Sequence, residues 1–396
     1  MLSTPLLPSA ALHQRLSTLD GAIVSSQDRA EALDRFSNTG SGRQKIGRFW
    51  RIDLDAIAPD AAGIAADGLT VRIDNRNVRA IACELADAAR DRGALLQRAF
   101  GATSAHATKY GALAHAFAGR GAFVYVPADA ACDEPIEITY TVAPGSAVFP
   151  STVVLLERGA RATVVERVEG GSGAFVCGVT EVVTEDDADL TYAAYQTLSD
   201  DARFFGVRAA RPGRGARFRW ADAQLGAALS VCDLSVEIDK PGVEAHITSL
   251  FFPAGTQHVD VVSTVDHRVG DSSSQTLVKS AGVGRGQARY LGNIRIAAHA
   301  GGSNASLRDD ALLLSEHANI DSVPALEIGA NDVKAYHGAT VGAIDQEQIF
   351  YMESRGIERS SAERMIALGF FEPAIEQFPG DALRAELRSA LAAKFA

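Results

Sequence analysis

The sequence is short of several residue types, and each shortage argues against a class of protein. Among 396 residues there are only 4 cysteines, and no two of them form a Cys-x-x-Cys pair. This argues against a disulfide framework and against the closely spaced thiolate ligands of zinc or ferredoxin-like sites. No long apolar run occurs, and the first residues lack a basic segment followed by an apolar one. We therefore expect no membrane span and no secretory signal, and a cytoplasmic protein.

Positive charge is also in deficit. The chain has 38 lysines and arginines against 49 aspartates and glutamates, which gives a net charge of -11. Because nucleic acids and anionic membranes attract basic faces, neither is expected as the main partner. Phosphate-binding loops, dinucleotide fingerprints, H-E-x-x-H pairs and nucleophile elbows are missing as well. We expect no catalysis by this chain alone, and no metal-binding residues can be named.

The first 120 residues are predicted to form a mostly helical domain. Residues Arg79 to Phe100 are rich in alanine and leucine at helical spacing, and residues 109–117 have the same pattern. The polar segment from Phe36 to Gly47 contains glycines and is predicted to be a loop. His106 and His115 are expected to be surface or packing residues rather than ligands.

From Gly121 onward the pattern changes to short strands. The phrases RGARATVV, DDADLTYA, RGARFRWA and PGVEAHIT repeat a turn followed by a strand, with Ala160, Ala188, Ala216 and Val243 in equivalent places. Their spacings are 188 − 160 = 28, 216 − 188 = 28 and 243 − 216 = 27. Such a period is typical of a stacked β-solenoid. We predict that residues 121–344 form it. The alternative is a β-sandwich with evenly spaced hairpins, but Asn-Gly and Asp-Gly turns are missing from this region.

Residues 345–396 are predicted to form a C-terminal helical domain. The segment from residue 331 starts like a strand, and a turn is predicted at His337-Gly338. Asp345 with Gln348 then predicts a capping box for one helix, and Gly356 predicts its end. A second helix is predicted to start with the capping box of Ser360 and Glu363, and its inward face is predicted to consist of Ala362, Met365, Ile366, Gly369 and Phe370. Helices before residue 121 and after residue 344 would cap the two ends of the solenoid.

Several blocks of this sequence resemble the SufB/SufD family of iron-sulphur cluster assembly proteins. The clearest is VKAYHGATVG followed by QIFY and SRGI, near the C-terminus. Residues 121–136, residues 155–166 and RFWRIDL at residues 48–54 are similar to three more blocks of the family, in the same order. The resemblance implies a mainly β fold, namely a right-handed parallel β-helix (solenoid) core with N-terminal and C-terminal helical caps.

The same resemblance implies a function. Members of the family are scaffold subunits of the SUF system, in which a D-type subunit pairs with a B-type paralogue. B-type members carry Glu directly after the histidine of the HGAT turn and a Cys in the stretch aligned with LRDDALLL. This chain has Gly338 and the acidic pair Asp309 and Asp310 there, which favours the D type. Many D-type members also have a Cys two residues before the histidine, where this chain has Ala335. The resemblance assigns His337 to the interface where a cluster forms.

In the family, the C-terminal helices dock an ABC-type ATPase. Exposed aromatic and arginine side chains would serve as anchors, and the residues that fit are Phe350, Tyr351, Arg355 and Phe371. Phe371 is expected to be exposed because Met365, Ile366 and Phe370 are expected to face inward. The alternative is that these aromatics only close the end of the β core. The resemblance implies no stably bound cofactor, a transient iron-sulphur cluster at the partner interface, and reduced flavin as an electron source in the complex. No flavin site can be named from the sequence. A homodimer is a further expectation.

Two other functions stay open at this stage. A B-type scaffold would need a reactive thiol, and Cys232 is the cysteine in the middle of the β region. A carbohydrate-active β-helix enzyme would need paired carboxylates beside stacking aromatics, but the chain has only two tryptophans, Trp50 and Trp220. The remaining histidines of the later β region are expected in solvated loops; they are His246, His258, His267, His299 and His317.

Overall fold

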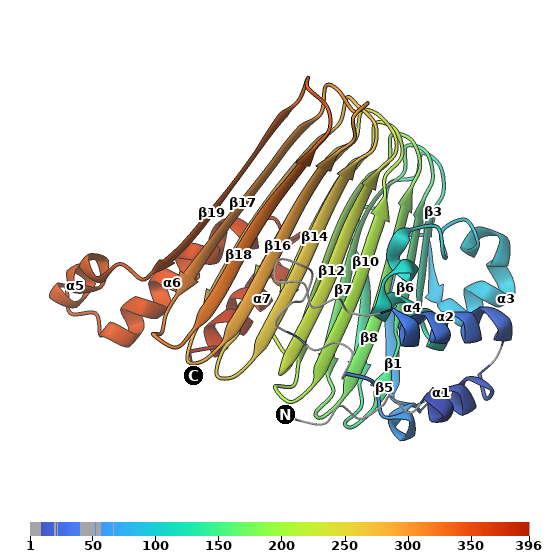
Figure 1. Ribbon diagram of the computed structural model, residues 1–396, viewed down its shortest axis with the longest axis horizontal. Helices are drawn as coiled ribbons and strands as arrows, with labels where there is room; N and C mark the ends of the chain where they lie inside the picture. Colours follow the sequence, from blue (N-terminus) through green and yellow to red (C-terminus); the bar gives the residue numbers. More distant parts are fainter. Residues whose placement is uncertain are drawn as a thin grey trace.

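The computed structural model describes residues 9–19, 21, 23–39, 52, 57–65 and 67–395. Within this part, the strands form two long sheets that run side by side along the molecule (Figure 1). Sheet A contains, in spatial order, β1 (Leu69–Asp74), β4 (Ile136–Val142), β7 (Arg161–Gly170), β9 (Asp189–Leu198), β11 (Arg217–Gln224), β13 (Glu244–Phe251), β15 (Ser273–Gly282), β17 (Asn304–Leu313) and β19 (Lys334–Ala343).

Sheet B has the complementary strands. In the reverse direction along the molecule they are β18 (Asn319–Ile328), β16 (Gln287–Ile296), β14 (His258–His267), β12 (Leu229–Ile238), β10 (Arg203–Arg211), β8 (Phe175–Thr184), β6 (Ser151–Leu156), β3 (Gly121–Val126) and β2 (Ile81–Glu84), with the short β5 (Ala147–Val148) beside β8. Because the chain alternates between the sheets from β3 onward, apart from the two-residue β5, each pair of successive strands makes one rung of a solenoid. The solenoid has about eight turns.

The predicted parallel solenoid is confirmed. Arg161, Asp189, Arg217 and Glu244 lie in register in sheet A, and each directly follows one of the residues that repeat in the sequence. Those residues, Ala160, Ala188, Ala216 and Val243, are at most 1% exposed. The hairpin alternative is wrong for this region, because every pairing of the described strands from β3 to β19 is parallel.

The turns between rungs explain the shared glycines of the repeat. Asp187 has a left-handed backbone (φ 59°), and Gly215 lies one rung further on with φ 65°. A Cβ atom on Gly215 would collide with a carboxylate oxygen of Asp187. The left-handed conformation at these places favours glycine or aspartate, and the close approach of the stacked turns favours glycine at residue 215.

The interior of the solenoid is largely apolar, and one layer of it holds three paired charges. Tyr192 and Trp220 are stacked on each other inside it, with ring centroids 4.6 Å apart. Beside them, the buried Arg208 guanidinium lies 3.5 Å from a Glu166 oxygen and 3.2 Å from an Asp222 oxygen. Buried charges are tolerated when they are paired in this way.

The N-terminal end of the solenoid is closed. β1 pairs antiparallel with β4 and β2 pairs antiparallel with β3, so different strand directions terminate both sheets. Helices lie at this end too (Figure 1), namely α1 (Ser9–Leu16), α2 (Ser26–Asn38), α3 (Leu85–Leu96) and α4 (Lys109–Phe117), with the 3-10 turns η2 (Ala61–Gly63) and η3 (Ser104–Ala107). α4 packs on the outer face of sheet B through Tyr110, which stacks on Phe205 at 4.0 Å.

Three expectations for the N-terminal part are wrong in part or fall outside the described residues. The helix expected over Arg79 to Phe100 is wrong at its start, because residues 81–84 form β2 before α3 begins. The loop expected from Phe36 is wrong over its first residues, since Phe36 is fully buried in α2. Residues 40–47 of that loop lie outside the described residues, and so does the block at 48–54 apart from Ile52.

The C-terminal helices are α5 (Gln346–Ser354), α6 (Arg359–Ile375) and α7 (Asp381–Ala393). Apolar residues of α6 and α7 pack on the outer face of sheet A; they include Phe371, Ala374, Leu383, Leu387 and Leu391 against Ala193, Ala221, Ala223 and Leu250. α5 instead projects away from the solenoid (Figure 1). These helices therefore cover one side of the solenoid, and among the described residues no element stacks on its last rung.

Candidate functional site

The last rung, made of β18 and β19, is the part of the β core that differs most from the rest. Each strand is the outermost of its sheet, so one edge of each has no paired strand in the described part of the chain. Large apolar side chains are exposed on it, with Tyr336 65%, Val341 44% and Ile328 42% exposed. Unpaired strand edges with exposed apolar side chains readily pair with another chain. We call this rung, residues 319–328 and 334–343, the open end.

His337 lies at the middle of β19, in the open end. The turn expected at His337-Gly338 is wrong, because β19 runs without interruption from Lys334 to Ala343 in register with β17. His337 pairs with Leu307, which is 1% exposed and faces the interior. In a parallel sheet, residues in register point to the same side. His337 therefore continues an interior column but is exposed, since no rung follows it.

The acidic pair of β17 is divided between the two faces of its strand. Asp310 is on the outer face, where Lys279 Nζ and Arg308 Nε each lie 2.8 Å from its Oδ2. Asp309 is on the inner face, 1% exposed, and accepts a hydrogen bond from the Ser322 hydroxyl of β18. Burial raises the pKa of Asp309 to about 6. Alternation along a strand thus gives adjacent carboxylates opposite environments.

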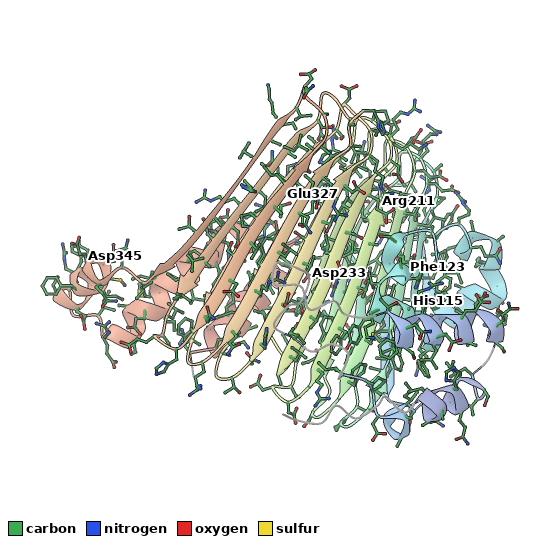
Figure 2. The ribbon with its side chains drawn as sticks, viewed as in Figure 1. His115, Phe123, Arg211, Asp233, Glu327 and Asp345 are labelled. Atoms are coloured by element: carbon green, nitrogen blue, oxygen red, sulfur yellow. The ribbon has the colours of Figure 1, made fainter. Side chains whose placement is uncertain are left out.

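α5 presents three of the four residues expected to dock a partner. Phe350 is 72% and Tyr351 59% exposed, while only Ile349 of this helix is buried. The Arg355 guanidinium lies 5.0 Å from the centre of the Tyr351 ring and donates to its hydroxyl at 3.0 Å. The helix begins at Asp345, which accepts a hydrogen bond from the Glu347 N–H, as the predicted N-cap requires. Figure 2 shows Asp345 at the base of this projecting helix.

The fourth residue, Phe371, does not join them. It is 0% exposed and packs between α6 and sheet A, 5.6 Å from the Phe252 ring, so the expected exposure is wrong. Met365, expected to face inward, is 55% exposed. Of the other residues expected to face inward, Ala362 is buried, Ile366 and Phe370 are half-buried against the core, and Gly369 is exposed. The second half of α6 packs on sheet A mainly through Phe371, Ala374 and Ile375, so its buried face is rotated from the expected one. The capping box of Ser360 and Glu363 is also wrong, because the N-cap is Glu358, two residues before Ser360, and it makes no side-chain cap.

Two groups needed by the alternative functions are buried. Cys232 is 1% exposed inside the solenoid, and burial raises the pKa of its thiol well above the usual value. A buried neutral thiol is a poor nucleophile. Trp220 is 1% exposed, so it cannot stack on a sugar at the surface. Trp50 lies outside the described residues.

The structure brings His106 and His115 together, although the sequence treats them as isolated. Their rings are 4.3 Å apart, and His106 Nε2 lies 2.8 Å from an oxygen of the buried Glu181. Burial lowers the pKa of His115 to about 4. No group of three or more His, Cys, Asp or Glu side chains in the described part of the chain could hold a metal ion. The prediction that His267 lies in a solvated loop is wrong. Its ring is fully buried between the hydroxyls of Ser272 and Ser274.

Sequence reasoning missed Ser322 and Tyr336 at the open end. Ser322 is thirteen residues from Asp309 and in the other sheet, so only the solenoid register brings the two together. Tyr336 could have been found, since it precedes His337 in a strand that ends the repeat. None of the helices among the described residues has the length and apolar character needed to cross a bilayer.

Comparison with known proteins agrees with this architecture. A family model described as SUF system FeS cluster assembly, SufBD core domain, matches residues 139–370. An iron-sulfur cluster assembly SufBD family protein of Mycobacterium leprae is 27% identical over 274 residues, which are 67% of this chain and 31% of the relative. A SufBD family protein of Staphylococcus epidermidis is 25% identical over 275 residues, or 68% of this chain and 59% of the relative. The chain thus spans between 31% and 59% of the length of these relatives.

Proposed function

This chain belongs to the SufBD family, and we propose that it is a non-catalytic scaffold subunit of the SUF iron-sulphur cluster assembly system. The observation that carries this proposal is the open end, where the β core stops with two unpaired strand edges and exposed apolar side chains. A scaffold needs a surface that another chain completes. A cytoplasmic location follows from the same proposal.

The partner we propose for the open end is a B-type paralogue. A paralogue with the same solenoid would present matching strand edges, which makes a pseudo-symmetric pair geometrically simple. This chain would then be the D-type member. The resemblance places Gly338 and the acidic pair Asp309 and Asp310 where the B type has its glutamate and its cysteine, and Cys232, in the middle of the solenoid, is buried.

His337 is the residue of the open end that we place at the assembly site. Its imidazole is exposed on the inward side of β19, where a covering chain would enclose it. The transient iron-sulphur cluster is cargo in this proposal and not a resident cofactor. Reduced flavin would act as an electron source from elsewhere in the complex, since no residue of this chain is assigned to it.

The second proposed contact is with an ABC-type ATPase through α5. Phe350, Tyr351 and Arg355 form an exposed aromatic and cationic group on a helix that leaves the core. Such anchors dominate the affinity of protein interfaces. Phe371 is withdrawn from this surface because it is buried.

Co-purification of the tagged chain with a co-expressed B-type paralogue and ATPase tests both contacts. We expect Val341→Lys to abolish recovery of the paralogue, because it places a charge on the unpaired strand. Phe350→Ala should reduce recovery of the ATPase alone. Val78→Lys is the matched control, since Val78 is an exposed valine like Val341 but lies at the closed end.

Some results of this experiment would contradict the proposal. Recovery of the paralogue with Val341→Lys at the wild-type level would exclude the open end as the interface. Recovery of no partner by the wild type, with both proteins present in the lysate, would exclude the assembly role. If the chain then sediments as a dimer that Val341→Lys dissociates, the open end pairs two copies of this chain instead.

A further inference from the structure

Asp309 and Ser322 form a polar pair across the interior of the solenoid, directly beneath the open end. Asp309 comes from β17 in sheet A and Ser322 from β18 in sheet B, and the serine hydroxyl donates to Oδ2 of the carboxylate. Asp309 is 1% exposed, whereas Ser322 is half-buried and belongs to the last rung. The pair therefore connects a partly accessible hydroxyl to a buried carboxylate.

The pair of Asp309 and Ser322 does not stabilise the fold as a buried ion pair would. The second carboxylate oxygen of Asp309, Oδ1, has no hydrogen-bond partner among the described residues. Arg308 of the same strand and Lys279 of β15 pair with Asp310 on the outer face and not with Asp309. A buried carboxylate with one donor and no cation is costly, and groups of this kind cluster at functional sites.

We propose that Ser322 and Asp309 are a proton relay that takes up a proton at the open end when a thiol of the covering chain becomes a thiolate. This inference rests on the proposed function, which supplies the covering chain and the need for thiolates. The thiol comes from that chain, since the four cysteines of this one lie before β13 and are buried or half-buried. Asp309 acts through Ser322 and is a positioning and proton-accepting group, not a ligand.

The transfer balances without an oxidant or reductant. The S–H bond of the thiol breaks and its proton passes to Ser322 Oγ, while the Ser322 O–H proton passes to Asp309 Oδ2. The electron pair stays on sulphur, and the products are a thiolate and a neutral carboxylic acid. Thiolates, not thiols, bind metal ions, so capture of the thiolate by iron would pull the transfer forward. Asp309 later returns its proton to solvent by the reverse path.

The groups facing Asp309 leave it available for this role. Inward-facing neighbours on β15 and β19 are Val278 and Ala339, neither of which titrates. Tyr290 of β16 directs its hydroxyl to Ser263 at 2.5 Å, and burial, aided by the Asp309 charge, raises its pKa far above neutrality. The charge of Asp310, on the outer face, helps to raise the pKa of Asp309. His337 is diagonal to Asp309 on the same inner face of the sheet.

Infrared difference spectra of the isolated chain test the carboxylate directly. Between pH 5 and pH 7 we expect loss of a protonated carboxylic acid band with a midpoint near 6, absent in Asp309→Asn. Glu327→Gln is the control, because Glu327 (labelled in Figure 2) is an exposed carboxylate on the outer face of β18, the strand that carries Ser322, and lies 3.2 Å from Arg295. Retention of the band in Asp309→Asn would overturn the assignment.

The rate of cluster formation in the complex with the B-type paralogue tests the relay. Removal of a proton acceptor typically lowers a rate by 10²-fold or more, so we expect Asp309→Asn to slow assembly about 100-fold at pH 7. The inflection near pH 6 should vanish, and Ser322→Ala should shift it while the complex still forms. An unchanged pH profile in Asp309→Asn would overturn the relay. Failure of the wild type to form any complex would instead sink the proposed function and the thiol donor with it, while the infrared titration still decides the state of Asp309.

Discussion

The two ends of this solenoid differ in how their outermost strands are covered. At the N-terminal end, β1 and β2 pair antiparallel with the first rung, and α3 and α4 cover its outer surface. At the C-terminal end, β18 and β19 stop with unpaired edges, although three helices follow them in the chain. Since exposed edges invite aggregation, natural proteins usually cover them. An edge left free beside helices that could have covered it is what the proposed interface requires.

The ends also differ in how their buried ionisable groups respond to pH. His115 at the closed end is held neutral, whereas Asp309 beneath the open end is held close to protonation. Buried groups of opposite charge type shift their pKa in opposite directions. Stability should thus depend on pH with opposite signs at the two ends. Four predictions sharpen or break this comparison.

The largest effect on the free energy of unfolding is expected in the buried charged layer formed by Glu166, Arg208 and Asp222. Arg208→Ala leaves Glu166 and Asp222 buried without their cation, which should destabilise the fold by about 3–5 kcal/mol in urea unfolding. Arg219→Ala is the control, since Arg219 pairs with Asp189 on the outer face and is 45% exposed. Equal losses of unfolding free energy in the two variants would show that the buried charged layer stabilises the fold no more than a surface ion pair does.

Asp309→Asn should stabilise the isolated chain at neutral pH. The folded-state pKa is about 6 and the unfolded value about 3.9, so the wild type has its full stability below pH 4 and loses it as the pH rises through 6. The difference amounts to about 3 kcal/mol by pH 7, and the amide should not show it. Urea unfolding between pH 4 and pH 7.5 measures this. A variant less stable than wild type at pH 7 would mean that the carboxylate is structural.

His115→Phe should remove an acid-sensitive contribution at the closed end. Because the folded-state pKa of His115 is about 4 and the unfolded value about 6.5, its contribution is present above pH 6.5 and is lost as the pH falls toward 4. We expect the variant to retain about 2 kcal/mol more of its neutral-pH stability at pH 4.5 than the wild type. His299→Phe, in an exposed turn, should leave the wild-type acid profile unchanged. If stability depended on pH in the same way in both variants, His115 would not be the source of the acid sensitivity.

The smallest effect is expected at α5. Asp345→Ala removes the N-cap hydrogen bond to Glu347 and should cost about 1 kcal/mol within this helix. Hydrogen exchange should accelerate in residues 346–354 and stay unchanged in β18 and β19. Faster exchange in the strands as well would mean that α5 and the open end unfold as one unit.

Much of the β core can be predicted because the rungs repeat. Ala160, Ala188, Ala216 and Val243 occupy one buried position in successive turns, so packing forces the same small residue types to recur. The helix start at Asp345 and the helix end at Gly356, whose φ is +82°, are equally local and were equally predictable.

The residues of the site are harder to predict, because distant parts of the chain decide their positions. His337-Gly338 has the composition of a turn, but its register with β17 keeps it extended. Phe371 is buried because α6 packs against sheet A, which no spacing within α6 reveals. Asp309 and Ser322 meet only through the alternation of strands between sheets. The proposed pairing with a paralogue depends in the same way on a chain outside the sequence.

The position of the closed end also has a consequence for synthesis. Residues of β1 to β4 leave the ribosome before any later rung, and domains generally fold from the N-terminus as they emerge. In a solenoid each rung contacts mainly its neighbours, so a capped first rung can template the second, and so on along the chain. The open end is then the last rung to be made, ahead of α5, α6 and α7. During translation the next strand of each sheet covers the free edge of the strand before it, until β18 and β19 are complete and their outer edges stay unpaired in the described part of the chain.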